Sequence, residues 1–488
     1  MCLLAGVLGE FSAGIWCYGA KAVFLQGESM NPTMMQLPED FREQMLHQLG
    51  TAEAESLFAA LDSEPPVSIR INARKGRGGE GDPVPWCATG RYLPRRPQFT
   101  LDPLLHAGCY YVQEASSMAV EQAYRVLKRR LEETGEAPRR VLDLCAAPGG
   151  KSTLWASLLE DALLVCNEPV RERAQILAEN MTKWGAPDVV VTNAYPKDFS
   201  PLVNFFDVIA ADVPCSGEGM FRKDEGARSE WSADNVKACA ERQRSIIADV
   251  WPALRPGGFL VYSTCTFNLQ ENEDNVRYIC SELGATPIDL SESLGMEGST
   301  WGTHFFPHRA RGEGFFLALL QKDAAALPAF HRKKQKQAKG VPQVPSDAVS
   351  LLKWLDAPQD YTLYMSDDEC LYALRQPVVD GVRQILATPL RTHVWKTGVM
   401  LARRKGNKWQ PAAALALSTA LAGDAFPRAE LSLAEALDYL RREAIVLPAD
   451  TPRGYVLVCY NGHPLGFVNN LGTRANNLYP AEWRIRRL

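Results

Sequence analysis

The chain has 488 residues, of which 46% are hydrophobic and 23% charged, and its 57 acidic and 53 basic side chains give a formal net charge of −4. This composition is typical of a soluble globular protein of roughly three domains, and the negative balance excludes a chain that coats itself in nucleic acid, so RNA or DNA binding must come from local basic patches. The 12 cysteines include no CxxC pair and no even small-domain spacing, which argues against a zinc site or a disulfide framework and favours a reducing, cytoplasmic location.

Residues 1–33 are predicted to be a non-structural extension. They are largely apolar and glycine-rich, but Glu10 interrupts the run and no basic segment precedes it. The pattern therefore fits neither a membrane span nor a signal peptide, and no membrane partner is expected. Met30 or Met34 is a candidate for the functional start.

Residues 34–120 are predicted to form a small N-terminal α/β domain that binds RNA. The apolar spacing from Leu37 to Leu61 is helical, and Val67 to Asn72 predicts a short strand. The loop that follows is basic and is either solvated or in contact with phosphate groups, and the sequence leaves both interpretations open. Its cations are Arg91, Arg95 and Arg96.

Residues 121–325 are predicted to be the catalytic domain, because strand and helix patterns alternate from about Arg140 onward. A helix from Arg171 to Trp184 carries its apolar residues on one face. Such alternation predicts a mostly parallel sheet with helices on both faces and ligands at the carboxyl ends of the strands. The predicted strands are Val141–Leu144, Leu163–Glu168, Asp188–Asn193, Phe206–Asp212 and Gly258–Cys265.

The last third of the chain is predicted to hold a basic linker at 326–345, an intermediate domain at 346–425 and a small β-rich domain at 426–488. The linker contains the run from His331 to Lys339, which serves either solubility or RNA contact. In the final domain Leu431–Arg442 predicts an amphipathic helix, and the apolar runs on either side of Asn461–Gly462 predict a strand pair.

A glycine turn from Leu142 to Lys151 follows the first strand of the catalytic domain. Gly150-Lys151-Ser152 resembles the end of a P-loop, but the position where that motif requires its first glycine is occupied by Cys145. A P-loop is therefore not expected. The turn also departs from the G-x-G-x-x-G fingerprint of dinucleotide-binding proteins, although the order of strand, turn and helix is the same. Glu168 lies about 20 residues further on, where it could accept hydrogen bonds from ribose hydroxyls. S-adenosylmethionine has no pyrophosphate. A glycine turn that binds it therefore needs to bring its backbone close to the cofactor more than it needs a phosphate site.

Two cysteines follow later strands, within Asp212-Val213-Pro214-Cys215 and Ser263-Thr264-Cys265-Thr266. A nucleoside turn together with two thiols at strand ends indicates covalent chemistry on an electrophilic ring, one sulfur attacking and the other assisting. Buried core cysteines are the alternative.

These motifs together resemble the NOL1/NOP2/Sun family of RNA cytosine-C5 methyltransferases, strongly over residues 100–320. The remainder is similar to the bacterial 16S ribosomal RNA branch of that family, through Ser68 to Asn72 and a tail from Asn476 to Arg486 that resembles a PUA-like domain. The resemblance implies a Rossmann-like α/β methyltransferase sheet, S-adenosylmethionine as cofactor, and ribosomal RNA or the small-subunit particle as partner of a monomer. It is carried by Tyr111 to Glu114, the Ala147 to Lys151 turn, Asp212 to Gly219, Ser263 to Thr266 and Glu271 to Glu273.

The resemblance also implies the site. Cys265 attacks C6 of cytosine, Cys215 assists release, Asp212 contacts N3 and the exocyclic amine, and Lys151 lies near the base. Asn193 is expected at the adenine, although Ala194-Tyr195-Pro196 depart from the family pattern after it. The expected cofactor residues are Cys145, Ala146, Ala147, Pro148, Gly149, Gly150, Lys151, Glu168, Arg173, Asn193 and Asp212.

Two other functions share part of this pattern. A DNA cytosine-C5 methyltransferase shares the covalent logic but does not carry the Thr-Cys-Thr nucleophile, and a non-catalytic RNA-binding assembly factor is expected to have lost a thiol or the turn. Transfer RNA stays open as a substrate. Phe221 is expected either to stack on an unpaired base, with Arg222 and Lys223 on phosphates, or to pack in the core. His304 and His308 lack a third ligand of matching spacing, so no metal is expected.

Overall fold

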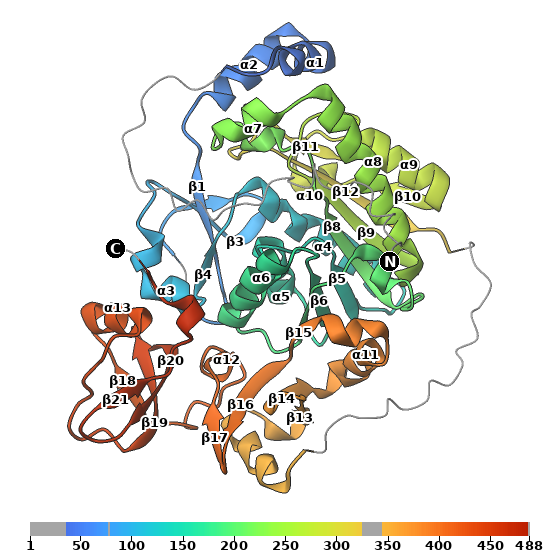
Figure 1. Ribbon diagram of the computed structural model, residues 1–488. Helices are drawn as coiled ribbons and strands as arrows, with labels where there is room; N and C mark the ends of the chain where they lie inside the picture. The colour runs from blue at the N-terminus through green and yellow to red at the C-terminus, as the bar shows by residue number, and fades with distance from the viewer. Residues whose placement is uncertain (1–35, 77–78, 325–343, 487–488) are drawn as a thin grey trace, which may run out of the picture.

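The computed structural model describes residues 36–76, 79–324 and 344–486. The predicted extension at 1–33 and most of the predicted linker lie outside these residues. Figure 1 shows an N-terminal helix pair at the top, a central sheet covered by helices, and a β-rich domain at the lower left. None of the helices in the described part of the chain is long and apolar enough to cross a membrane.

The N-terminal segment predicted as helical forms two helices, α1 (Glu39–Leu49) and α2 (Thr51–Leu61). Gly50 separates them with φ 78°, a left-handed conformation that favours glycine, and its N–H donates to the carbonyl of Leu46. Apolar spacing alone could not predict this break. The two helices pack on the catalytic domain through Phe41, whose ring lies 5.1 Å from that of Phe221.

A four-stranded sheet follows the helix pair, with the order β2-β3-β1-β4. Its third member in that order, β1, matches the predicted short strand. The short helix α3 (Pro103–His106) precedes β4. The strands are β1 (Val67–Ile71), β2 (Asp82–Val84), β3 (Cys87–Leu93) and β4 (Tyr110–Val112).

The central sheet has the order β10-β12-β9-β8-β5-β6-β7-β15, with β11 paired to β12. The five predicted strands are all present, and they are the parallel members, β7, β6, β5, β8 and β9. The strands are β5 (Arg140–Asp143), β6 (Leu163–Asn167), β7 (Val189–Thr192), β8 (Phe206–Asp212), β9 (Leu254–Thr264), β10 (Ala285–Ile288), β11 (Thr303–Phe305), β12 (Phe315–Lys322) and β15 (Val394–Thr397).

Helices cover both faces of this sheet, because successive strand residues point to opposite sides. Val141 packs in the core on one face, against α4, α5 and α6, whereas Leu142 packs in the core on the other, against α8, α9 and α11. The helices are α4 (Val120–Glu132), α5 (Gly150–Leu158), α6 (Arg171–Trp184), α7 (Glu225–Glu230), α8 (Ala233–Val250), α9 (Glu273–Leu283), α10 (Ser291–Leu294) and α11 (Gln376–Leu386). The expected doubly covered α/β sheet is confirmed.

Part of the segment predicted as an intermediate domain belongs to this sheet. Strand β15 pairs antiparallel with β7, and Arg375 forms ion pairs with Asp188 and Asp161 of the catalytic domain. In Figure 1 the orange helix α11 lies beside β15, and its apolar residues pack on the face of the sheet that carries Leu142. The rest of the segment forms a sheet of order β13-β14-β16-β17 followed by α12. Its elements are β13 (Tyr361–Met365), β14 (Cys370–Arg375), β16 (Val399–Lys405), β17 (Lys408–Pro411) and α12 (Ala413–Ala416).

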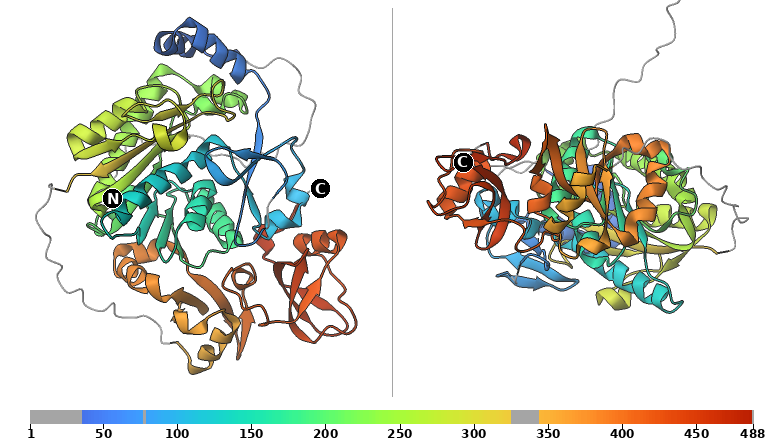
Figure 2. Two further views of the ribbon diagram at one scale, coloured as in Figure 1. Left: turned by 180° about the vertical axis from the view of Figure 1, so that it is seen from behind. Right: turned by 90° about the horizontal axis from the view of Figure 1, so that it is seen from below.

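The C-terminal domain is a four-stranded sheet of order β18-β19-β20-β21 with one helix, α13. The predicted strand pair is present, and its turn residues Asn461 and Gly462 have φ 50° and 77°, as a tight hairpin requires. The domain packs on Ala107 and Cys109 beside α3, and lies at one end of the molecule (Figure 2). Its elements are β18 (Arg428–Glu430), α13 (Leu433–Arg441), β19 (Gly454–Tyr460), β20 (His463–Asn470) and β21 (Ala475–Asn477).

Candidate active site

The glycine turn joins the carboxyl end of β5 to α5. Gly149 has φ 117° directly before the helix, which a residue with a side chain would adopt only with strain. At the strand end, Asp143 is buried and accepts a hydrogen bond of 2.6 Å from Ser152 Oγ. Burial raises the pKa of Asp143 to about 7, and the hydroxyl of Ser152 opposes that rise.

Other residues of the turn are held by a neighbouring strand end and by α6. The N–H of Ala146 donates to the carbonyl of Asn167, and Asn180 Nδ2 donates to the carbonyl of Pro148. Cys145 is partly buried, and burial raises the pKa of its thiol well above the usual value, so this sulfur stays protonated. Gly150 begins α5, and a Cβ there would lie 3.4 Å from the ring of Tyr111.

Glu168 follows β6 with its carboxylate almost fully buried. Oε1 accepts from the N–H of Val170 at 3.0 Å, and Oε2 lies 3.4 Å from Arg173 Nη1. Burial raises the pKa of Glu168, and Arg173 opposes the rise. Arg173 also donates to the carbonyl of Ala147 at 2.9 Å, so it connects the acidic strand end to the glycine turn. A carboxylate has about four acceptor positions, so Glu168 keeps capacity for ribose hydroxyls and fits an S-adenosylmethionine site.

Asn193 lies after β7 in the same row of strand ends. Its side-chain amide donates to the carbonyls of Glu168 and Pro169 at 2.8 and 2.9 Å. The amide group therefore holds the backbone that carries Glu168. A contact with adenine stays a prediction for this residue.

The two cysteines predicted to react face each other across the ends of β8 and β9. Cys215 Sγ lies 3.2 Å from Cys265 Sγ, and both side chains are partly exposed. The hydrogen bond to Cys265, followed by burial, raises the pKa of Cys215 well above its usual value. Cys215 therefore holds its proton at neutral pH, and its S–H is available to donate to the sulfur of Cys265.

Lys151 and Asp212 form an ion pair beside these thiols, with Nζ 2.9 Å from Oδ2. Burial lowers the pKa of Lys151, but Asp212, with help from Cys265 and Asp143, outweighs burial and the net pKa is raised. Ser263 Oγ donates to the other carboxylate oxygen of Asp212 at 2.8 Å. A fixed ammonium group, a fixed carboxylate and two sulfurs thus meet at the carboxyl edge of the sheet.

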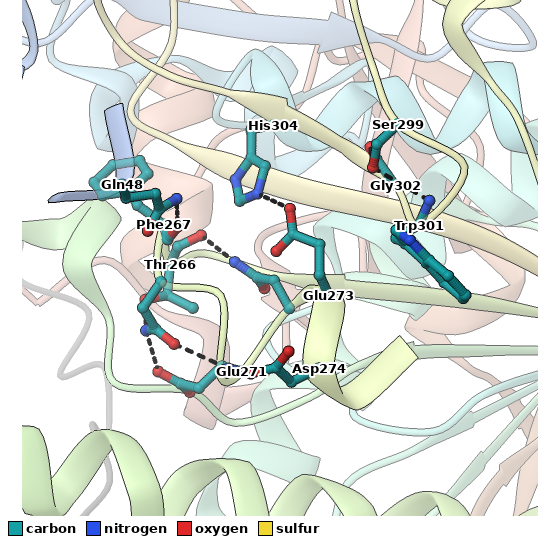
Figure 3. Close-up of polar contacts among 12 residues, drawn as sticks. Gln48, Thr266, Phe267, Glu271, Glu273, Asp274, Ser299, Trp301, Gly302 and His304 are labelled. Atoms are coloured by element: carbon teal, nitrogen blue, oxygen red, sulfur yellow. Dashed lines mark hydrogen bonds and ion pairs between the residues drawn. The ribbon is translucent and has the colours of Figure 1, made fainter. Parts of the chain in front are cut away.

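A buried polar network ties the loop after Cys215 to the loop after Cys265. Glu218 accepts from the N–H groups of Phe267 and Asn268, and Glu271 accepts from the N–H of Ser216 and from Gln243. Figure 3 shows the loop at Thr266, Phe267 and Glu271, with Gln48 of α1 donating to the carbonyl of Phe267 at 2.9 Å. The positions of the two thiols therefore depend on the N-terminal helices as well as on the sheet.

Comparison with known proteins decides the family. The chain is 33% identical over 415 residues to ribosomal RNA small subunit methyltransferase F of Erwinia tasmaniensis, covering 82% of this chain and 84% of that protein. It is 31% identical over 474 residues to the protein of the same name from Shewanella baltica, covering 92% and 97%. The chain belongs to the ribosomal RNA small subunit methyltransferase F family.

Three family models match separate parts of the chain. They are described as 16S rRNA methyltransferase RsmB/F for residues 127–321, the N-terminal domain of 16S rRNA methyltransferase RsmF for residues 37–115, and the methyltransferase RsmF PUA domain for residues 426–485. The crystal structure of PH0851 shares the fold, with TM-score 0.52 and 23% identity over 60% of this chain and 70% of that chain. The resemblance, the methyltransferase class with its S-adenosylmethionine cofactor, and the PUA domain are confirmed.

The structure decides between the two interpretations of Phe221 and distinguishes Arg91 from its neighbours. Phe221 is fully buried among Phe41 and Trp231, so it packs in the core and does not present a stacking face. Arg91 donates to the carbonyls of Ala88 and Gly90 within its own strand and turn, so it differs from the exposed Arg95.

Sequence reasoning assigned no role to Ser263, Glu271 or Arg70. Ser263 is the register partner of Asp212 and lies two residues before Cys265, a spacing that could have placed it on the same face of β9. Arg70 is fully buried and donates to Gln113 and Thr153, so it joins β1 to the helix after the glycine turn. In the sequence, the one sign of this role is a charged residue within an otherwise apolar strand pattern.

The two histidines considered as ligands are hydrogen-bonded to carboxylates. His304 Nε2 lies 2.8 Å from Glu273 Oε1, as Figure 3 shows, and His308 Nε2 lies 2.9 Å from Glu53 Oε2. Over residues 36–76, 79–324 and 344–486 no group of three His, Cys, Asp or Glu side chains could hold a metal ion.

Proposed function

We propose that the protein transfers a methyl group from S-adenosylmethionine to C5 of a cytosine in 16S ribosomal RNA, through a covalent bond between Cys265 and C6. The relatives are named ribosomal RNA small subunit methyltransferase F, and the family models name 16S rRNA. The observation that carries the mechanism is the 3.2 Å approach of Cys215 and Cys265 beside the Lys151–Asp212 pair. We further propose that the enzyme acts as a cytoplasmic monomer on the RNA or on the small-subunit particle.

The first step is attack by Cys265. A thiolate is the effective nucleophile, and Cys215 and Lys151 are the polar groups beside the sulfur of Cys265. Addition to C6 converts C5 into an enamine-like carbon able to accept a methyl group. The target base must be unstacked to reach both sulfurs.

The second requirement is control of charge on the ring. Asp212 is oriented by Lys151 on one oxygen and by Ser263 on the other, so it is held before the base arrives. A carboxylate held in this way can accept hydrogen bonds from the exocyclic amine and from a proton on N3, and so stabilises the N3-protonated ring. Bound S-adenosylmethionine supplies the electrophilic methyl group, and Glu168, Arg173 and the glycine turn are the residues proposed to hold it.

The last step is release, in which C5 loses its proton and the bond between Cys265 and C6 breaks. A base takes the proton from C5, and the electron pair of the broken S–C6 bond returns to Cys265. We assign assistance in this elimination to Cys215, whose sulfur lies 3.2 Å from that of Cys265 and would take the proton in its deprotonated form. Cys265→Ala should leave neither methyl transfer nor a denaturant-stable adduct while RNA binding persists. Cys215→Ala should accumulate an RNA adduct that survives denaturing electrophoresis.

The other outcomes distinguish the alternatives. Two similarly destabilised proteins without any adduct would indicate that both cysteines only pack the core. An adduct from Cys265→Ala and none from Cys215→Ala would reverse the roles. Bisulfite sequencing of RNA from cells with and without the gene identifies the modified cytosine and separates ribosomal from transfer RNA.

A further inference from the structure

A basic pocket of about 750 Å³ lies between the N-terminal sheet and the catalytic domain. It is lined by the end of β3 and the loop after it, by the segment after η4 (Glu218–Met220), and by residues 307–312. Its only acidic lining residue is Glu64. Its cationic lining residues are Arg95, Arg96, Arg222, Lys223, Arg309 and Arg311.

Half of these cations are neutralised within the protein. Arg309 pairs with Glu53, Arg311 with Asp82 and Lys223 with Glu313. In the described ranges no carboxylate lies within ion-pair distance of Arg95, Arg96 or Arg222. The pocket therefore keeps an excess of positive charge within a chain whose net charge is −4. Such a local excess attracts an anionic ligand.

Two lining residues also carry buried atoms with no hydrogen-bond partner in the described structure. One is Arg222 Nε, whose neighbours Nη1 and Nη2 donate to the carbonyl of Gly312 and to Ser63 Oγ. The other is Nδ1 of His308, whose side chain is only 8% exposed; because Nε2 donates to Glu53, this Nδ1 is an acceptor in the neutral ring. Arg222 Nε is a buried donor, and an acceptor oxygen of a ligand would satisfy it. This donor points to an oxygen-rich anion.

The pocket is adjacent to the two thiols along the chain. Gly219 donates its N–H to the carbonyl of Cys265 at 2.8 Å, and Arg222 follows three residues later. A span of three residues is at most about 11 Å. Gly312, whose carbonyl accepts from Arg222, is two residues from Gly314, and Gly314 lies beside Gly219. A polymer with one unit at Cys265 can thus place its neighbouring units in the pocket.

We propose that this pocket holds phosphodiester groups of the RNA strand next to the target cytosine, with Arg95, Arg96 and Arg222 as their ligands. Arginine presents a planar fork of donors that matches phosphate oxygens. The pocket combines contributions from the N-terminal and catalytic domains, so it fixes the strand relative to Cys265 and selects an extended, unpaired segment. This inference rests on the proposed RNA substrate and names the surface that positions it.

Arg95 and Arg96 are the appropriate residues to change, because both are exposed, and the melting temperature reports any loss of the contact between Arg96 and the ring of Phe99. The double variant R95A/R96A should bind a short single-stranded RNA containing cytidine about tenfold more weakly at about 0.15 M salt. The plot of log K against log salt should become less steep by about 1.4, since each single-strand phosphate contact contributes about 0.7. The KM for RNA should rise while S-adenosylmethionine affinity and melting temperature stay unchanged.

The matched control is R129A/R130A, which removes the same charge from exposed positions at the end of α4. If the control weakens RNA binding equally, or if R95A/R96A keeps the wild-type salt slope and KM, the pocket does not hold the RNA. Failure of the proposed function would instead appear as absent methyl transfer by the wild-type protein. The two failures are therefore distinguishable.

Discussion

Gly219→Ala tests whether backbone packing between the two cysteine loops sets the reaction geometry. A Cβ at this position would lie 2.9 Å from the carbonyl oxygen of Cys265 and 3.1 Å from that of Gly314. Both obstacles are backbone atoms, which cannot swing aside as a side chain can. Ordinary contacts between carbon and oxygen are about 3.3–3.6 Å, so the loop carrying Cys265 must move by about half an ångström.

The expected cost has two parts. Overpacking of this kind destabilises a protein by about 1–3 kcal/mol. Because a displacement of about 1 Å can reduce a rate about 100-fold, a shift half as large should slow single-turnover methyl transfer roughly tenfold. The assay uses saturating S-adenosylmethionine and RNA, so that binding does not limit the rate, and urea unfolding measures stability in parallel.

The control is Gly423→Ala, because a Cβ there meets nothing within 4 Å and the backbone has no left-handed φ. It should change neither stability nor rate. A wild-type single-turnover rate for Gly219→Ala would refute the argument that this contact positions Cys265, whatever the change in stability.

Two further predictions concern buried carboxylates. Glu168→Ala should weaken S-adenosylmethionine binding by about 1.5–3 kcal/mol, the range for hydrogen bonds to a charged group; wild-type affinity in calorimetry would place the ribose elsewhere. Asp143 has a folded-state pKa of about 7, above its unfolded value of about 4, so the stability it contributes is present below about pH 4 and is lost as pH rises through 7. Asp143→Asn, which can still accept from Ser152, should therefore show a smaller loss of stability between pH 5 and 8 in urea unfolding, and an unchanged loss would contradict the assignment.

The sequence predicted those parts of the fold that local patterns encode. Helix α6 begins and ends where its apolar face predicted, and the turn at Asn461–Gly462 is present because these residues tolerate a left-handed backbone. The break at Gly50 was missed, since apolar spacing continues across it. The family motifs located the thiols and the glycine turn, while the roles of individual site residues stay predictions.

Local sequence patterns could not predict contacts between segments that are distant in the chain. The burial of Phe221 depends on Phe41, 180 positions away, and the 3.2 Å approach of Cys215 to Cys265 depends on the pairing of β8 with β9. The charge of the loop at Arg95 was visible in the sequence, but its position opposite Arg222 was not. Only the folded chain places these groups on one surface.

The pairing of β15 with β7 makes the catalytic domain dependent on residues synthesised long after it. About 200 residues separate the two strands in the chain, so at about 5–20 residues per second translation delivers β15 roughly 10–40 s after β7. Until then the edge of β7 is open to pairing with another strand, which is an aggregation hazard. A fragment that ends near residue 325 lacks β15 and keeps the edge of β7 unpaired, so we expect it to aggregate more readily than the full chain.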